Sequence, residues 1–244
     1  RDIRGKRIGM IFQEPMSALD PVFTVGEQIA EGLRAHGKIS HAEARDRALG
    51  ALRSVGIAAP EKRFHAYPHQ LSGGMRQRVM IAGAMICNPQ LLIADEPTTA
   101  LDVTVQAQIL ELLRDLSDRA HMALLFITHD LGVVAETCTR MLTMYAGEIV
   151  EDAAVDAALE HPLHPYTSGL LRALPRLSAR RAALPSIPGR VPTLGQMPHG
   201  CRFRQRCPYA TDGCEQPQTL RDAGNGRRVR CWRFRDLGLP GVAA

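Results

Sequence analysis

Three short segments of this sequence carry residue types that could bind a phosphate compound and cleave it. Leu71-Ser72-Gly73-Gly74 offers a serine hydroxyl and unhindered backbone amides at the start of a predicted helix, where an anion binds favourably. The run Leu91–Glu96 is apolar and ends in two adjacent carboxylates, which suits a buried strand that presents acids to a magnesium nucleotide. A second apolar run, Ala123–Ile127, leads to Thr128-His129. Each segment alone is common, so the signal lies in their fixed order.

An alternation of strands and helices is predicted to position these segments. Short apolar runs bounded by turn residues indicate strands, and capping residues followed by periodic apolar positions indicate helices. The predicted strands are residues 7–12, 91–94, 123–128, 140–145 and 148–150. The predicted helices begin at Thr24, Ser40, Ser72, Asp102, Leu131 and Tyr166. This order predicts an α/β layered fold with a largely parallel sheet, in which the runs 91–94 and 123–128 are buried on both faces.

Taken together, the three segments resemble the ATP-binding cassette (ABC) ATPases, and the resemblance extends over nearly the whole chain. It implies an α/β, P-loop NTPase-like ABC ATPase domain that binds ATP and Mg²⁺ and works as a head-to-tail dimer. The string from Leu71 to Arg78 is similar to the signature motif of that family. Ser72, Gly73 and Gly74 are therefore expected to close over the ATP held by the opposite subunit.

The resemblance also implies a role for individual polar residues. Asp95 is similar to the aspartate that holds Mg²⁺, and Glu96 to the catalytic carboxylate that polarises the attacking water. His129 is similar to the switch histidine that contacts the γ-phosphate. Gln13 resembles the glutamine that senses Mg-ATP and bends toward the transmembrane partner. Asp102 resembles the aspartate at the dimer seam, although a role as helix cap explains it equally well.

One part of the family pattern is missing from these residues. The phosphate-cradling Gly-x-x-x-x-Gly-Lys-Ser/Thr loop, called Walker A, belongs tens of residues before the glutamine, and only 12 residues precede Gln13. The segment Gly32–Ile39 matches the glycines and the lysine, but Ile39 has no hydroxyl for Mg²⁺ and the segment leaves a predicted helix instead of a strand. We therefore expect an N-terminally truncated, incomplete ABC domain that is inactive alone.

Longer strings are similar to a narrower branch, the ATP-binding subunits of bacterial dipeptide, oligopeptide and nickel importers. They are Gln13–Pro21, Tyr67–Gln70, Pro162–Thr167 and Gly200–Phe203, the last followed by Arg206-Cys207-Pro208. The resemblance implies a second ABC ATPase subunit, two transmembrane permease subunits and, indirectly, a substrate-binding protein as partners. It leaves the transported solute open, because selectivity in such systems lies in other chains.

Four of the six cysteines, Cys201, Cys207, Cys214 and Cys231, lie in the last 44 residues with the spacing C-x5-C-x6-C-x16-C. Disulfides are disfavoured in a reducing cytoplasm, and structural zinc sites usually contain a close C-x(2–4)-C pair, which this pattern lacks. Four thiolates can hold a 4Fe–4S cluster at varied spacings. We expect an iron–sulfur cluster first, zinc second and unligated thiols third.

Charge and composition divide the chain near residue 165. Residues 1–165 contain 16 Lys and Arg against 21 Asp and Glu, whereas residues 166–244 contain 14 Arg against 4 Asp and Glu. This predicts a boundary near residue 165. The resemblance then implies an ABC ATP-binding domain over residues 1–165, from the loop that contains Gln13 (the Q-loop) to the loop that contains His129 (the H-loop), and an irregular Cys-rich peptide-importer extension over residues 166–244. The basic extension could contact nucleic acid, anionic lipid or an acidic protein, and a solvated tail explains it at least as well.

The expected function is an ATP-binding and ATP-hydrolysing subunit that energises peptide import. No run approaches the roughly 20 apolar residues that span a bilayer, so any membrane role is expected to come through partners. The resemblance implies a peripheral position on the cytoplasmic face of the membrane. One alternative is a non-hydrolysing partner cassette that donates its signature motif in trans. The other is a soluble ABC protein that acts on nucleic acid. It predicts a second cassette or a long coiled-coil insertion, and the sequence contains neither, so no nucleic-acid partner is expected.

Overall fold

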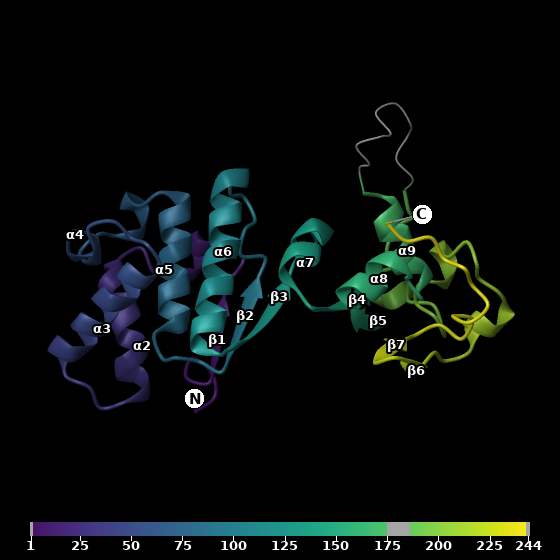
Figure 1. The fold of residues 1–244 in the computed structure, drawn as a ribbon, viewed down its shortest axis with the longest axis horizontal. Helices are drawn as coiled ribbons and strands as arrows, with labels where there is room; N and C mark the ends of the chain where they lie inside the picture. Colours follow the sequence, from purple (N-terminus) through teal and green to yellow (C-terminus); the bar gives the residue numbers. More distant parts are fainter. Residues whose placement is uncertain (1, 175–185, 243–244) are drawn as a thin grey trace. The chain divides into compact units, whose positions relative to one another are not determined.

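The structure is a computed structural model that describes residues 2–174 and 186–242. It divides into two compact units, one ending at His129 and the other beginning at Asp130 (Figure 1). The division lies well before the boundary near residue 165 that composition suggests, so that boundary falls inside the second unit. Among the described residues, no helix combines the length and the apolar character needed to cross a membrane.

The first unit contains a parallel sheet with helices packed against it (Figure 1). Its strands pair in the order β1-β2-β3, with Ile8 opposite Leu91 and Leu91 opposite Ala123. The strands are β1 (Ile8–Ile11), β2 (Leu91–Asp95) and β3 (Ala123–Ile127). The helices are α1 (Pro15–Ala18), α2 (Val25–His36), α3 (His41–Ser54), α4 (Pro60–Phe64), α5 (Gly73–Met85) and α6 (Val103–Ala120), with a 3₁₀ turn at Pro68–Gln70. The α/β class and the parallel sheet are confirmed.

Four helices of this unit begin where the capping residues predict. The side-chain oxygens of Thr24, Ser40, Ser72 and Asp102 each accept a hydrogen bond from the backbone N–H three residues later. Such a cap satisfies one of the N–H groups that a helix leaves unpaired at its start. These residues therefore fix where α2, α3, α5 and α6 begin, and with them the loops that join the helices to the strands.

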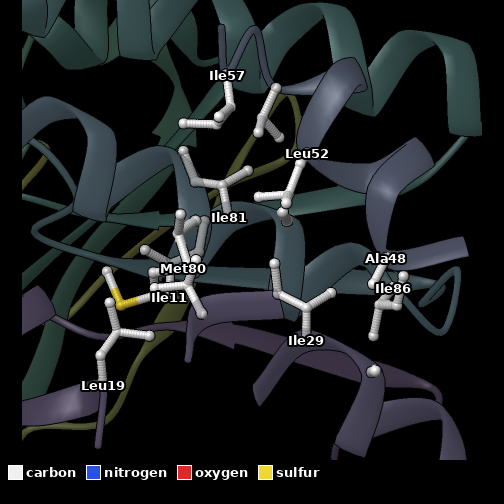
Figure 2. Packing of buried hydrophobic residues seen from close by; sticks show 14 of the residues in the cluster. Ile11, Leu19, Ile29, Ala48, Leu52, Ile57, Met80, Ile81 and Ile86 are labelled. Atoms are coloured by element: carbon white, nitrogen blue, oxygen red, sulfur yellow. The ribbon is translucent and has the colours of Figure 1, made fainter. Parts of the chain in front are cut away.

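The core of the first unit lies between the sheet and its helices. Figure 2 shows Ile11 of β1, Ile29 of α2, Leu52 of α3 and Ile81 of α5 converging in this core, and all four are buried. The same cluster includes Leu92 and Ala94 of β2 together with Ile109 and Leu113 of α6. Burial of this apolar surface is the main favourable contribution to the stability of the unit.

The prediction that β3 is buried on both faces is wrong for the part of the chain that the structure describes. The side chains of Leu125 and Ile127 are 42% and 44% exposed. Leu124 and Phe126, which point to the opposite face, pack partly against the core. β3 is an edge strand of this sheet, and only one of its faces meets the helices. An apolar run by itself does not reveal how many faces of a strand are covered.

The second unit is built around an antiparallel sheet with the strand order β4-β5-β7-β6. The strands are β4 (Arg140–Tyr145), β5 (Glu148–Ala154), β6 (Arg221–Gly224) and β7 (Arg227–Val229). The helices are α7 (Leu131–Thr137), α8 (Val155–Glu160) and α9 (Pro165–Arg172), with 3₁₀ turns at Leu194–Gln196, Arg204–Arg206 and Asp212–Glu215. The extension is thus more ordered than expected, because β7 pairs with β5 and joins the sheet of the preceding segment.

The hairpin between β6 and β7 contains a turn sequence that is typical of two-residue hairpins. Asn225 and Gly226 connect the two strands and both have positive φ, 52° and 72°. Asn-Gly is the preferred pair for a two-residue hairpin turn, because asparagine and glycine tolerate this left-handed backbone. The signal is local and was available in the sequence.

Two buried carboxylates of β5 form ion pairs with arginines, two of which belong to the arginine-rich extension. The carboxylate of Asp152 is fully buried and accepts hydrogen bonds from Arg140 at 2.7 Å and from Arg228 at 2.6 Å. The buried Glu151 carboxylate pairs with Arg227 at 3.0 Å and also accepts the backbone N–H of His164. Arg227 and Arg228 hold the extension to β5 through these two carboxylates, so part of the positive charge of the extension is paired within the unit.

Candidate functional site

The polar residues that follow the three parallel strands gather at one edge of the sheet. Gln13 lies two residues after β1, Glu96 directly after β2, and His129 two residues after β3. Because parallel strands end at the same edge, side chains that follow them can meet there although they are distant in sequence. The motifs, which are separate along the chain, therefore form a single site in the structure.

The carboxylate of Glu96 is the centre of this site. Its Oε2 atom accepts a hydrogen bond from Nε2 of Gln13 at 3.1 Å and from Oγ1 of Thr99 at 2.7 Å. Its Oε1 atom lies 3.1 Å from Nδ1 of His129. The hydroxyl of Thr99, followed by the His129 contact, lowers the pKa of the Glu96 carboxyl below its ordinary value. Glu96 is thus held in the ionised form, which is the form that can accept a proton from water.

His129 and Glu96 differ in how much of each side chain is exposed to solvent. The side chain of His129 is 77% exposed, whereas that of Glu96 is 24% exposed. His129 therefore touches the carboxylate while most of its ring remains open to a ligand. Asp95 is the last residue of β2, is half-buried and stands beside Glu96 in the chain. The two acids therefore lie next to each other at the end of the strand, as the apolar run before them predicts.

The described residues include no group of three or more His, Cys, Asp or Glu side chains placed to hold a metal ion. Mg²⁺ in nucleotide sites is held by one or two carboxylates, by water and by the phosphates themselves. The adjacent carboxylates of Asp95 and Glu96 at the strand end fit that requirement, since they supply oxygen ligands without a complete protein cage. The position of Asp95 is thus compatible with a magnesium nucleotide.

The segment Ser72–Gly74 forms the first turn of α5, as the sequence predicts. Ser72 is the N-cap, and its hydroxyl accepts the N–H of Met75 at 3.4 Å. A Cβ atom at Gly74 would lie 3.0 Å from Cγ1 of Val105 in α6, and one at Gly73 would lie 3.9 Å from Leu101. Gly74 therefore has a packing reason to be glycine, in addition to the open backbone that phosphate binding needs. The first turn of α5 therefore packs against the start of α6.

Asp102 caps α6, and its Oδ1 atom accepts the N–H of Val105 at 2.9 Å. This confirms the capping role, while a role at a dimer seam stays a prediction. The structure thus brings Gln13, Glu96 and His129 into direct contact, and it places Ser72–Gly74 and Asp102 at two neighbouring helix starts.

The structure shows the roles of two sequence features, Thr99 and the segment Gly32–Ile39. Thr99, which makes the shortest contact to Glu96, was missed because its spacing of three residues from the acid is also that of an ordinary turn. The segment Gly32–Ile39 begins inside α2, which ends at His36, and Gly37 is the C-cap of that helix. It joins two helices, as predicted, and is not the strand–loop–helix unit of a phosphate-binding loop.

The second unit contains a small cavity lined by all four cysteines of the extension. The cavity has a volume of about 20 Å³, and His164 and Phe203 also line it. Cys201, Cys207 and Cys231 are half-buried, Cys214 is buried, and all four are free thiols. The structure thus gathers the cysteines at one place. Their sulfur atoms do not form a metal-binding group in this part of the chain, so the expected iron–sulfur or zinc site is not seen.

Burial shifts the pKa of two cysteines and of the histidine that line this cavity. It raises the pKa of the Cys207 and Cys231 thiols to about 11, and the neighbouring cysteines add to the shift because thiolates repel one another. Burial also lowers the pKa of His164 to about 3, so the ring is neutral and its Nδ1 can accept the N–H of Tyr166. A bound cation would have to displace the thiol protons before the sulfur atoms could act as ligands.

Comparison with known proteins defines the class to which this fold and site belong. A family model described as "ABC transporter" matches residues 1–99, and one described as "Oligopeptide/dipeptide transporter, C-terminal region" matches residues 150–214. The dimeric ATP-binding cassette MJ0796 bound to ADP and Pi has a TM-score of 0.56 and is 33% identical. The cbiO1 protein of Clostridium perfringens has a TM-score of 0.55 and is 30% identical. The fold is that of an ATP-binding cassette.

Relatives that are similar in sequence over nearly the whole chain narrow the class of protein. The "Probable peptide ABC transporter ATP-binding protein y4tR" of Sinorhizobium fredii is 55% identical over 239 residues, which cover 97% of this chain and 71% of the relative. The "Oligopeptide transport ATP-binding protein AppD" of Bacillus subtilis is 53% identical over 238 residues, which cover 97% of this chain and 72% of the relative. The chain belongs to the family of ATP-binding proteins of peptide ABC transporters.

The match to the solved cassettes is shorter. It covers 63% of this chain and 65% of the MJ0796 chain, and 62% of this chain and 59% of cbiO1. The chain thus spans less than two thirds of the length of these solved cassettes.

Proposed function

We propose that this chain is the ATP-hydrolysing subunit of an importer of dipeptides or oligopeptides, with nickel as the alternative cargo. The observation that carries the proposal is the contact of Glu96 with Gln13 and His129 at the carboxyl edge of the parallel sheet. A family match in the cassette and a second one in the extension support it. The protein works as a peripheral subunit on the cytoplasmic face of the membrane.

The chemistry follows from the positions of the side chains. Glu96, ionised and half-buried, accepts a hydrogen bond from the water that attacks the γ-phosphorus, and the bond to the leaving ADP then breaks. His129, whose ring is largely exposed, contacts the γ-phosphate. Asp95 would hold the magnesium ion, whose positive charge would offset the negative charge of the phosphates. Gln13 reports the presence of Mg-ATP, because its amide reaches Glu96 directly from the end of β1.

The partners follow from the signature segment at the start of α5. A second ATPase subunit packs head to tail, so that Ser72, Gly73 and Gly74 of this chain close over the ATP of that subunit. MJ0796, a solved relative of 33% identity, is dimeric. Closure of the dimer drives two permease subunits through the Gln13 loop, and a substrate-binding protein delivers the cargo to them.

We further propose that hydrolysis needs a Walker A segment besides these residues. The sequence contains no Gly-x-x-x-x-Gly-Lys-Ser/Thr string, and the nearest match lies at the end of α2. The test compares ATP hydrolysis by the purified 244-residue chain with hydrolysis by a chimera that adds a strand–Gly-x-x-x-x-Gly-Lys-Ser/Thr–helix segment before residue 1. We expect turnover only in the chimera. Turnover by the chain alone, after contaminants are excluded, would refute this requirement, and a chimera that binds ATP without hydrolysing it would refute the ATPase function.

The gathering of four cysteines supports a proposal for the extension. A 4Fe–4S cluster, or zinc as the alternative, would be held by Cys201, Cys207, Cys214 and Cys231 in a structural role. The support is that all four side chains line one cavity although up to 30 residues of chain separate them. The donor set suits a soft metal, since four thiols and one neutral histidine surround the cavity.

A further inference from the structure

We propose that Thr99 is a positioning residue whose hydroxyl holds the catalytic carboxylate of Glu96 in place for ATP hydrolysis. The inference rests on the proposed ATPase function. It concerns a residue that lies outside the set expected from the sequence and that makes the shortest hydrogen bond to Glu96 in the structure.

Thr99 holds Glu96 at two points. Its backbone N–H donates to the backbone oxygen of Glu96 at 3.2 Å, and its Oγ1 hydroxyl donates to Oε2 of the carboxylate at 2.7 Å. The second distance is typical of a hydrogen bond to a charged acceptor, which is stronger than one between neutral groups. One residue thus fixes both the main chain and the side chain of the acid.

The turn between the two residues needs such support. Glu96 and Ala100 have positive φ, 43° and 64°, a left-handed conformation that residues with a Cβ rarely adopt. Pro97 follows Glu96 and limits the backbone of the preceding residue further. Strained backbone of this kind persists only where neighbouring contacts hold it, and it is common at catalytic sites. The two bonds from Thr99 close the turn that aims the carboxylate.

The other two contacts of Glu96 are of a different kind. Gln13 and His129 come from the ends of β1 and β3, and in the proposed mechanism His129 contacts the γ-phosphate. Thr99 belongs to the same short turn as Glu96 and moves with it. When His129 leaves the carboxylate, the bond from Thr99 remains and still orients it.

This arrangement also assigns the two carboxylate oxygens. Oε2 is engaged by Thr99, so it keeps its hydrogen bond throughout the cycle. Oε1 is engaged by His129, and it becomes free when the histidine contacts the γ-phosphate. Oε1 is therefore the atom that accepts the hydrogen bond from the attacking water, and Thr99 is the group that keeps this atom aimed at it.

The experiment uses the active chimera with the Walker A segment and measures kcat and KM for ATP. Thr99→Val removes the hydroxyl at nearly constant shape, and Thr99→Ser keeps it. We expect the valine variant to lose about tenfold in kcat with an unchanged KM, and the serine variant to stay within about twofold of the parent. Thr104→Val, at an exposed position of α6, is the matched control.

A double-mutant cycle separates positioning from a purely structural role. If Thr99 acts through the carboxylate, Thr99→Val causes no further loss in a protein that already carries Glu96→Gln. A valine variant with the parent kcat, a serine variant as slow as the valine variant, or full additivity in the cycle would each overturn the inference while the ATPase function stands. An inactive parent chimera would overturn the proposed function and the inference with it.

Discussion

Asp152 of β5 and Arg228 of β7 face each other in the antiparallel register and form an ion pair at 2.6 Å, although 76 positions separate them. The carboxylate is fully buried, whereas the guanidinium is 50% exposed. The pair joins the strand that follows the cassette motifs to the arginine-rich extension. The extension is therefore part of the second unit's sheet and not an appended tail.

The first prediction concerns this ion pair. Asp152→Asn should lower the free energy of unfolding of the protein by about 2 kcal/mol, since it leaves two arginines without their shared partner and both stay partly solvated. Glu160→Gln, at an exposed position of α8, is the control. Chemical denaturation followed by circular dichroism measures both. Equal stability of the two variants would show that the pair contributes nothing.

The ion pairs of Asp152 also predict that the stability of the protein depends on pH. The Arg140 guanidinium, assisted by Arg228, lowers the pKa of the Asp152 carboxyl below its ordinary value of 3.8. A lowered pKa means that the unfolded chain binds the proton more readily, so the stabilisation is complete above pH 3.8 and disappears as the pH falls through the lowered pKa. The stability difference between the parent and Asp152→Asn should therefore shrink under strongly acidic conditions. A difference that stays constant down to the acid transition would contradict this.

The second prediction concerns the catalytic acid. In the chimera with the Walker A segment, Glu96→Gln should keep ATP binding and reduce hydrolysis by at least about a hundredfold, because a carboxamide is a much weaker base than a carboxylate. The ATP-bound closed dimer should then accumulate, and size-exclusion chromatography with ATP measures it. Turnover near the parent rate would show that another residue polarises the water.

The third prediction concerns His129. His129→Ala should lower kcat by at least about tenfold through loss of the γ-phosphate contact, while the stability of the protein stays nearly unchanged because the ring is largely exposed. His121→Ala, beyond the end of α6, is a matched control for the substitution. The ATPase rate and the midpoint of thermal unfolding are measured for both variants. A large loss of stability in His129→Ala would assign His129 a structural role.

The fourth prediction separates the packing role of Gly74 from its role in phosphate binding. Gly74→Ala should destabilise the protein by about 1 kcal/mol, since the new methyl group would meet Val105 at 3.0 Å. Adding Val105→Ala makes room and should restore the stability. The ATPase rate of the chimera should stay low in the double variant if the open backbone at Gly74 is needed at the nucleotide. Recovery of both properties would leave Gly74 with a packing role alone.

The fifth prediction concerns the cysteine cavity. Protein purified without oxygen should be brown and contain iron and acid-labile sulfide, and Cys207→Ser should abolish the colour and make the extension more sensitive to proteolysis. Cys87→Ser, in the first unit, should leave both unchanged. Stoichiometric zinc without iron would identify a zinc site. A colourless, metal-free protein with a protease-resistant extension would remove the ligand altogether.

The sequence by itself determined the features that depend on neighbouring residues. The caps at Ser72 and Asp102 and the carboxylates at the end of β2 depend on local hydrogen bonding and on short apolar runs, so their patterns can be read directly. The meeting of Gln13, Glu96 and His129 could also be foreseen, because all three follow strands of one parallel sheet. The resemblance of the motifs to ABC ATPases supplied the roles.

Only the tertiary structure decided the remainder. The pairing of β5 with β7, the exposed face of β3 and the shared cavity of the four cysteines arise from contacts between distant segments, which no local pattern encodes. The hydrogen bond from Thr99 to Glu96 is local, but it depends on a turn with positive φ values. These φ values cannot be predicted from the residue types in the turn. Sequence patterns report the hydrophobic and capping preferences of neighbouring residues, whereas strand partners and strained turns are selected by the packing of the whole unit.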